Sequence, residues 1–258
     1  MLKKDNNVKV RSIRSNIFRV SFDEEVKDFV TKDGIAAIAY FFYNMLILYL
    51  FGLMMFKTRI YSEFRTYSNI SNDMIYRFIF YIPIVILQLA PVFIFIKVRK
   101  QGLRSIGLKK DKILKSIFLG IIFSMPFNIP LIISEISEKG KILGLTNLIL
   151  TFVYFFIEIA LVEEISFRGF IQTRIQSLIK SKWVSILVVG VMFALMHIPF
   201  QIIKANMPLG DFIVKDSFHL VFTFVIHVYL VYIYTRDNNI ISSSITHTLI
   251  DFIPSIFI

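Results

Sequence analysis

Two adjacent carboxylates, Glu163 and Glu164, directly follow a long apolar run, in the stretch LVEEISFRGF. On one helix, Glu164 and Arg168 are four residues apart and share a face, so they can form an ion pair that keeps Glu164 ionised. Glu163 has Phe167 at the same spacing, which offers no polar partner. Glu163 is therefore the freer carboxylate, and a free carboxylate in apolar surroundings is suited to act as a general base.

Three further side chains with acid–base chemistry lie in later apolar blocks. His197 follows Phe193 by four residues and Asp251 follows His247 by four residues, so each pair shares one helix face. Because a charge at the bilayer centre is costly, ionisable groups at membrane depth are functional candidates by default.

Each of these groups also has a purely structural interpretation. Glu164 and Arg168 can be a structural ion pair, His197 a satisfied buried histidine, and His247 with Asp251 an interhelical hydrogen-bonded clip. Four other polar features are not assigned to the site: Glu158 (structural or pore-lining), His219 (interfacial), His227 (undecided) and Ser242–Ser244 (a small-residue packing face).

The elements that carry these residues are predicted to be membrane helices. The chain has 258 residues, of which 56% are hydrophobic and 18% are charged, and its mean hydropathy is +0.68. The apolar residues form long blocks, not an amphipathic pattern, so we predict an all-α polytopic membrane helical bundle.

The absence of cysteine excludes disulfides, thiol nucleophiles and cysteine-ligated zinc. We assign the net charge of +11 to contacts with the lipid bilayer, and not to nucleic acid.

About seven blocks, within a range of six to eight, are long enough to cross a hydrocarbon core of about 30 Å. They are Gly34–Phe56, Phe78–Ile96, Ile117–Ser134, Leu145–Val162 with a continuation, Trp183–Ile203, Phe218–Tyr234 and Ile240–Ile258. The third carries Pro126 and Pro130 and is the weakest prediction. We divide the chain into a basic cytoplasmic or interfacial segment (1–33), N-terminal transmembrane helices (34–144) and a catalytic transmembrane core (145–258).

The distribution of Lys and Arg favours a cytoplasmic N-terminus. With that orientation the cytoplasmic segments hold 21 of these residues, 8 in residues 1–33, 8 in 97–115, 4 in 168–182 and 1 at 236, whereas the outer segments hold 8. Because Lys and Arg concentrate in cytoplasmic loops, we predict a multi-pass protein of the cell membrane with its N-terminus inside. For seven spans the C-terminus would lie outside.

Helix depth decides whether the motifs can meet. At about 1.5 Å per residue, His197 lies about 21 Å into its helix, and His247 and Asp251 lie about 10 and 16 Å into theirs. Glu163 reaches a depth of about 16 Å only if the fourth helix continues to Arg174 or beyond. The helical spacing of apolar residues in EEISFRGFIQTRIQSLIK favours this continuation. We therefore expect the motifs to converge in one cavity on the cytoplasmic side.

Three familiar designs of intramembrane protease are absent from the sequence. No histidine is followed by glutamate, which excludes the HExxH zinc design. The stretch PLGD has proline where the GxGD aspartyl design needs glycine, and no GxSG serine motif precedes a helix. What is left is a pair of glutamates on one helix, a histidine on a second, and a histidine with an aspartate on a later one.

These motifs, EEISFR at Glu163–Arg168, FALMH at Phe193–His197 and HTLID at His247–Asp251, resemble the ordered pattern EExxxR, FxxxH and HxxxN/D. That pattern is typical of the type II CAAX prenyl endopeptidase-like family, also called the CPBP or Abi intramembrane proteases, and the resemblance covers roughly residues 145–255.

The resemblance implies an endopeptidase driven by a glutamate-activated water. It implies that Glu163 is the general base with His197 beside it, and that Glu164 and Arg168 support them. It also implies that His247 and Asp251 face the scissile carbonyl and stabilise the oxyanion.

The resemblance leaves metal dependence open, because the family is called metalloprotease-like. Glu163, His197, His247 and Asp251 could bind Zn²⁺. The alternative, which we favour, is a metal-free site built on protein dipoles.

The family has Asn or Asp at the position of Asp251. Asn donates a hydrogen bond as it stands, whereas Asp251 donates only when protonated; ionised, it would orient His247 or bind a metal.

The implied substrate is a membrane-associated peptide or protein, and nothing in the sequence requires it to be prenylated. A bias towards Ile, Lys, Asn and Phe suggests an AT-rich bacterial genome. For bacterial members the resemblance implies processing of peptide pheromone or bacteriocin precursors, or self-immunity to bacteriocins.

One alternative function is a non-catalytic membrane scaffold or immunity protein of the same fold. A proton-coupled transporter is the other, and it is disfavoured because the polar residues lie in one half of the chain only.

Overall fold

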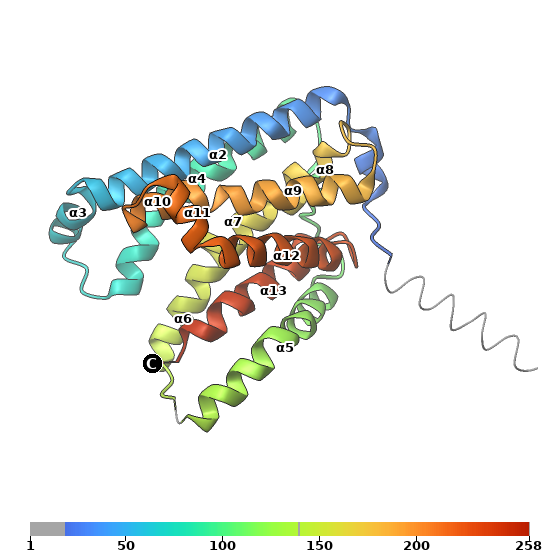
Figure 1. Cartoon of the computed structure of the whole chain (residues 1–258). Coiled ribbons are helices and arrows are strands. Elements are labelled where there is room, and N and C mark those ends of the chain that lie inside the picture. The colour runs from blue at the N-terminus through green and yellow to red at the C-terminus, as the bar shows by residue number, and fades with distance from the viewer. Residues whose placement is uncertain (1–18, 139, 258) are drawn as a thin grey trace, which may run out of the picture.

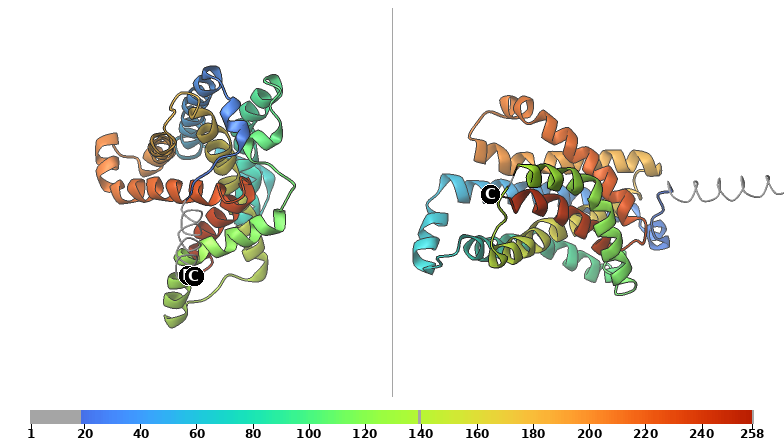
Figure 2. Two further views of the ribbon diagram at one scale, coloured as in Figure 1. Left: turned by 90° about the vertical axis from the view of Figure 1, so that its right-hand side faces the viewer. Right: turned by 90° about the horizontal axis from the view of Figure 1, so that it is seen from below.

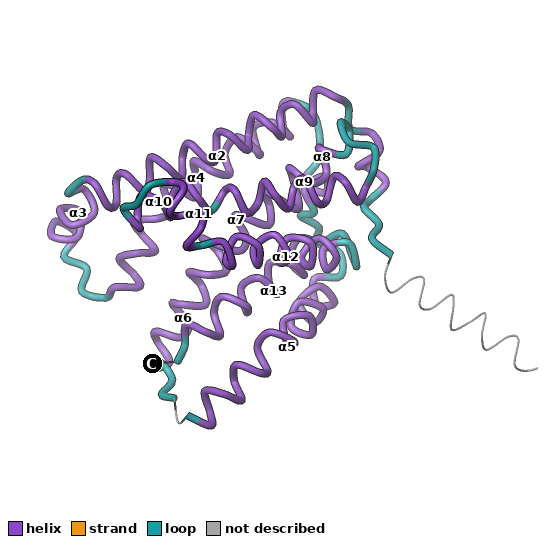
Figure 3. Tube along the Cα trace, viewed as in Figure 1, coloured by secondary structure: helices purple, strands orange, loops and turns teal. Residues whose placement is uncertain are grey.

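The fold comes from a computed structural model, which describes residues 19–138 and 140–257. Helices joined by short loops make up this part of the chain, and no β-sheet is present in it (Figures 1 and 3). The all-α prediction is therefore confirmed. Most of the basic segment predicted at 1–33 falls on residues 1–18, which lie outside the described part.

The described elements follow one another along the chain as η1 (Glu24–Asp28), α2 (Thr31–Lys57), α3 (Ile60–Ser68), α4 (Asp73–Val98), η2 (Leu103–Ile106), α5 (Ile113–Ser137), α6 (Leu145–Tyr154), η3 (Phe155–Ala160), α7 (Leu161–Glu164), η4 (Ile165–Ile171), α8 (Gln172–Ile175), α9 (Lys182–Met196), α10 (Ile198–Ala205), α11 (Leu209–Lys215), α12 (Ser217–Tyr234), α13 (Ile240–Phe252) and η5 (Ile253–Ser255).

Six helices in the described residues are long and apolar enough to cross a membrane: Thr31–Lys57, Asp73–Val98, Ile113–Ser137, Leu145–Ile175, Lys182–Ala205 and Ser217–Tyr234. This number lies within the predicted range, but the seventh predicted span, Ile240–Ile258, is wrong. The helix there, α13, has 13 residues and ends two residues before Pro254. At about 1.5 Å per residue it rises only about 20 Å, which is less than a hydrocarbon core requires.

The fourth span continues past Glu163, as expected. Segments α6, η3, α7, η4 and α8 form one helix of 31 residues that ends at Ile175. Two of these segments, η3 and η4, have the widened π-helical turn, and they lie on either side of the glutamate pair. Single π-helical turns within α-helices occur frequently at functional sites.

The third span, α5, is an uninterrupted helix of 25 residues despite its two prolines. It packs closely against α13 through small residues. A Cβ added to Gly120 would lie 2.8 Å from the carbonyl oxygen of Ser242, and Ser242, Ser243 and Ser244 are fully buried. The predicted packing role of the serine triplet is confirmed.

Within the described residues, the Lys- and Arg-containing segments 19–33, 99–115 and 174–182 lie together at one end of the bundle, on the right in Figure 1. Arg99 at the end of α4 contacts Asp33 at the start of α2 at 3.0 Å. Near them, Arg174 donates to the side chain of Gln101 at 2.7 Å. At the same end, the amide of Asn239, before α13, donates to the Lys109 carbonyl at 3.1 Å. The uneven distribution of Lys and Arg along the sequence therefore corresponds to two different ends of the folded bundle.

The other end carries α3, α10 and α11 (Figure 1). The C-terminus lies beside the connection between α5 and α6 in each view (Figures 1 and 2), where Ile142 and Phe257 form an isolated antiparallel bridge. The outer faces of the helices are apolar: Phe42 and Phe118 are both 62% exposed. Such faces suit contact with lipid, and the protein is a multi-pass membrane protein.

Candidate active site

Glu164 and Arg168 form the ion pair that their spacing predicts. Nη1 of Arg168 lies 2.9 Å from Oε1 of Glu164, and both side chains are fully buried. The guanidinium group of Arg168 also stacks on Phe193 of α9, with Cζ 4.3 Å from the ring centroid. The pair is therefore held between the long helix and α9.

His247 of α13 contacts the same carboxylate. Its Nδ1 lies 2.9 Å from Oε1 of Glu164. Because an ionised carboxylate only accepts hydrogen bonds, this nitrogen carries a proton. The other ring nitrogen, Nε2, lies 3.5 Å from Oδ2 of Asp251 and 3.8 Å from Oε2 of Glu163. Nε2 thus faces two acceptors, so a proton must sit on Nε2 or on one of the two carboxyl groups.

Glu163 is the less constrained of the two glutamates. Its side chain is 18% exposed, and its nearest ionic contact is the 3.8 Å approach of His247. Within the described residues, Oε2 of Glu163 is buried without a hydrogen-bond partner. The geometry therefore agrees with the prediction that Glu163 is the freer carboxylate.

His197 lies at the junction of α9 and α10. The backbone N–H of His197 donates to the Ala194 carbonyl, which leaves the Phe193 carbonyl to accept from Nδ1 of His197 at 2.8 Å. Nδ1 therefore carries a proton, and Nε2 of the neutral ring is an acceptor. His197 lines the wall of the central cavity.

A cavity of about 1030 Å³ joins these groups. The side chains on its wall that could take part in acid–base chemistry or bind charge are Arg77, Glu158, Glu163, His197, Lys204, His219, His247 and Asp251. Glu164 and Arg168 are not on the wall and lie behind it. The structure thus brings the three sequence motifs to one place, with the ion pair as their support.

The cavity lies towards one end of the bundle, which bears on its expected cytoplasmic location. Its wall includes residues near helix ends, Tyr61, Arg77, Lys204 and Pro254, and all of them lie at the end of the bundle that carries few Lys and Arg. The cavity therefore extends away from the Lys- and Arg-rich end. With the predicted cytoplasmic N-terminus, the cavity would extend towards the outer face and not towards the cytoplasm; the orientation itself stays a prediction.

Two wall residues were not foreseen from the sequence. Arg77 lies just outside the predicted span Phe78–Ile96, but α4 begins at Asp73, where the side chain of Asn72 caps the first turn by accepting from two backbone N–H groups. The signal that could have found it is this capping Asn72. His219 was interpreted as interfacial, yet it lines the cavity, and its ring centroid is 5.9 Å from that of His197.

The two undecided residues have clear positions. Glu158 lines the cavity and is 5% exposed, in agreement with a pore-lining interpretation. His227 is fully buried away from the cavity wall, and its Nε2 lies 3.2 Å from Oε1 of Gln172. His227 therefore has a packing and hydrogen-bonding role.

The possible zinc ligand set does not fit a metal ion in this geometry. Among the described residues, no group of three or more His, Cys, Asp or Glu side chains is arranged to hold one metal. Nδ1 of His197 donates to a carbonyl and Nδ1 of His247 donates to Glu164, and these bonds fix the two rings without occupying either Nε2.

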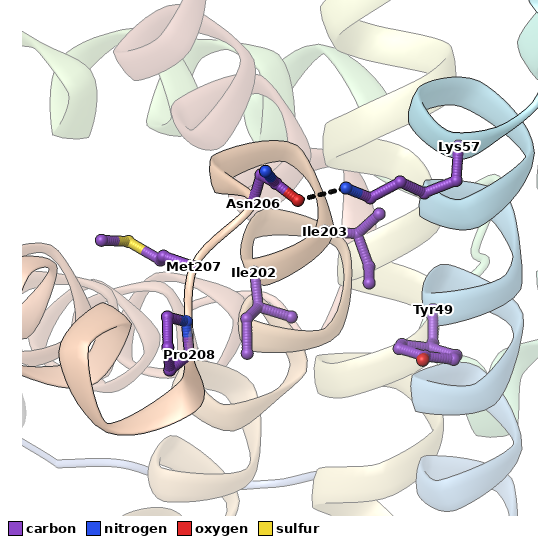
Figure 4. Close-up of a pocket in the computed structure, with 7 residues that line it drawn as sticks. All are labelled: Tyr49, Lys57, Ile202, Ile203, Asn206, Met207 and Pro208. Carbon is purple, nitrogen blue, oxygen red and sulfur yellow. Dashed lines mark hydrogen bonds between the residues drawn. The ribbon is translucent and has the colours of Figure 1, made fainter.

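A second, smaller pocket of about 400 Å³ lies between α2 and the connection from α10 to α11 (Figure 4). Nζ of Lys57 donates there to the side chain of Asn206 and ties the two elements together. Its wall, formed by Tyr49, Lys57, Ile202, Ile203, Asn206, Met207 and Pro208, contains no carboxylate or imidazole. It offers no group for hydrolysis.

Comparison with known families supports the motif assignment. Residues 145–253 match the family model described as type II CAAX prenyl endopeptidase Rce1-like. All three motifs lie inside the matched residues, so the resemblance inferred from them is confirmed over this part of the chain. Searches of curated proteins and of solved structures each gave no match.

Proposed function

Because residues 145–253 match the type II CAAX prenyl endopeptidase family, we propose that this protein is an intramembrane endopeptidase that hydrolyses peptide bonds of a membrane-associated peptide or protein. The observation that carries the proposal is the meeting of Glu163, His197, His247 and Asp251 on one cavity wall in the membrane-spanning bundle, with the Glu164–Arg168 pair behind it.

Two acceptors are available to hold the attacking water. The carboxylate of Glu163 accepts one water hydrogen, and Nε2 of neutral His197 accepts the other. As the water oxygen attacks the scissile carbonyl carbon, Glu163 takes its proton as a general base. The same proton then passes from Glu163 to the leaving amine when the C–N bond breaks, so that the products are a carboxylic acid and an amine.

Two donors are available for the oxyanion. The attack moves an electron pair onto the carbonyl oxygen, and preorganised hydrogen bonds to that oxygen lower the barrier. In the proposed state, Nε2–H of His247 and the protonated carboxyl of Asp251 supply them. The 2.9 Å contact from Nδ1 of His247 to Glu164 fixes the ring for this purpose.

The location of the substrate follows from the charge bias. We assign the N-terminus to the cytoplasm of a bacterial cell, because the Lys- and Arg-rich segments form one end of the bundle. The cavity then extends towards the outer face. This suits a peptide that has already crossed the membrane, such as a pheromone or bacteriocin precursor or a bacteriocin that the cell must inactivate.

The proposal is tested with purified protein in proteoliposomes and a mixed-sequence library of twelve-residue peptides, with products identified by mass spectrometry. Glu163→Gln should lower the rate at least about 100-fold while the protein still inserts and folds. The matched control is Glu63→Gln, because Glu63 is exposed on α3 away from the cavity. A knockout strain would then be complemented with wild type or with Glu163→Gln. A peptide found in the membrane or the medium only with wild type would identify the substrate. Equal cleavage by Glu163→Gln and wild type would refute the role of Glu163, and absence of cleavage by wild type would favour a binding or immunity protein.

A further inference from the structure

Glu158 is a buried carboxylate on the cavity wall that the proposed chemistry does not use. It is 5% exposed, and neither of its oxygens has a hydrogen-bond partner among the residues that the structure describes. It lies in η3, five residues before Glu163 on the same helix, and both side chains line the same cavity. An unpaired carboxylate in apolar surroundings is costly, so its position points to a partner that arrives with a ligand.

Arg77 of α4 provides a donor on the same wall. Its guanidinium lies over the Tyr154 ring, with Cζ 5.6 Å from the centroid, and Tyr154 also lines the cavity. Helices α4 and η3 pack against each other. Arg77 and Glu158 attract each other electrostatically, but the described residues show no ion pair between them within 4.0 Å. Both oxygens of Glu158 therefore remain free to accept a hydrogen bond from a ligand.

We propose that Glu158 and Arg77 form a subsite that binds the main chain of the substrate in an extended conformation. An extended peptide presents N–H and C=O groups along its edges. One N–H of the substrate donates to Glu158, and a nearby C=O accepts from Arg77. This inference rests on the proposed endopeptidase function and adds how the substrate is held.

The register of the subsite follows from helix geometry. Five residues separate Glu158 from Glu163, which corresponds to a rise of about 7.5 Å along the helix. An extended peptide advances about 3.3 Å per residue. The N–H that Glu158 accepts therefore belongs to a residue about two positions from the scissile bond.

The experiment uses the best-cleaved peptide of the twelve-residue library and a series in which each backbone amide in turn is replaced by an ester, which removes one N–H and keeps the side chains. With wild-type protein, the ester two positions to one side of the scissile bond should lower kcat/KM about tenfold or more, because a hydrogen bond to a charged group is lost. Glu158→Ala should lower kcat/KM for the all-amide peptide by a similar factor. The same ester should then have no further effect on Glu158→Ala.

Arg77→Met is the second variant. Because Arg77 is exposed, the substitution should leave folding intact. It should weaken binding of the same peptide and raise KM more than it lowers kcat. The inference is overturned if the ester effect at that position is equal in wild type and in Glu158→Ala, or if no ester near the scissile bond has an effect. A strict requirement for Lys or Arg in the substrate without an ester effect would also overturn it, since Glu158 would then serve a side chain.

The two proposals fail in different ways. If wild type cleaves no peptide, the endopeptidase function falls and the subsite falls with it. If Glu163→Gln is inactive and Glu158→Ala cleaves like wild type, the function stands and only the subsite is wrong.

Discussion

Nδ1 of His247 lies 2.9 Å from Oε1 of Glu164, the oxygen that Arg168 also contacts at 2.9 Å. This contact joins α13 to the long fourth helix across 83 residues of sequence. One glutamate oxygen thus accepts a hydrogen bond from His247 and makes an ion pair with Arg168. Glu164 is therefore poorly placed to take a proton from water, and the neighbouring Glu163 is left for that task.

Asp251→Asn should keep cleavage within about threefold of wild type, whereas Asp251→Ala should lower kcat about 100-fold or more. The reason is that Asn donates a hydrogen bond to the oxyanion without needing a proton of its own. Steady-state kinetics on the library peptide measures both variants. Complete loss in Asp251→Asn would show that charge or metal binding at this position matters instead.

Arg168→Met should destabilise the fold by about 3 kcal/mol, because it leaves Glu164 buried without its cation. Unfolding by sodium dodecyl sulfate, followed by circular dichroism, measures the loss. Arg168→Lys keeps the charge and should be milder. The double variant Arg168→Met with Glu164→Gln should recover part of the stability, and additive losses would argue against a coupled pair.

Phe193→Leu should lower stability more than it lowers turnover. The ring stacks on the Arg168 guanidinium and packs against the His197 ring, with centroids 5.0 Å apart. A desolvated cation–π contact contributes about 2 kcal/mol. However, His197 is held by the Phe193 backbone carbonyl, which the substitution keeps. We expect a lower melting temperature and kcat within about threefold of wild type.

Phe118→Leu is the control for Phe193→Leu, since Phe118 is 62% exposed on α5. It should leave both the melting temperature and kcat unchanged. Selective loss of turnover in stable Phe193→Leu protein would mean that the ring itself takes part in substrate binding or chemistry.

Treatment with 1,10-phenanthroline or EDTA should leave cleavage unchanged, because the described His, Asp and Glu side chains form no metal-ligand group. The measurement is the rate before and after chelation, together with the metal content of active protein. A chelator-dependent loss that Zn²⁺ restores would reverse this assignment and make Glu163, His197, His247 and Asp251 the first candidates for its ligands.

The sequence predicted well what depends on neighbouring residues of one helix. Apolar block length predicts membrane helices, and the continuation of the fourth helix to Ile175 followed from its apolar spacing. The spacing of four residues likewise predicted the contacts of Glu164 with Arg168 and of His247 with Asp251. Composition was less informative about length: the final apolar block predicted a full span, but α13 ends at Phe252.

By itself, the sequence determined the membrane class, the helices and the order of the three motifs, because hydropathy and residue spacing along a helix are local properties of the chain. Only the tertiary structure decided that His247 contacts Glu164, that Glu158 and Arg77 share a cavity wall, and that the cavity extends away from the Lys- and Arg-rich end. These relationships depend on the rotation and tilt of each helix against its neighbours. Packing between distant segments sets that rotation and tilt, which the residue pattern of a single helix does not predict.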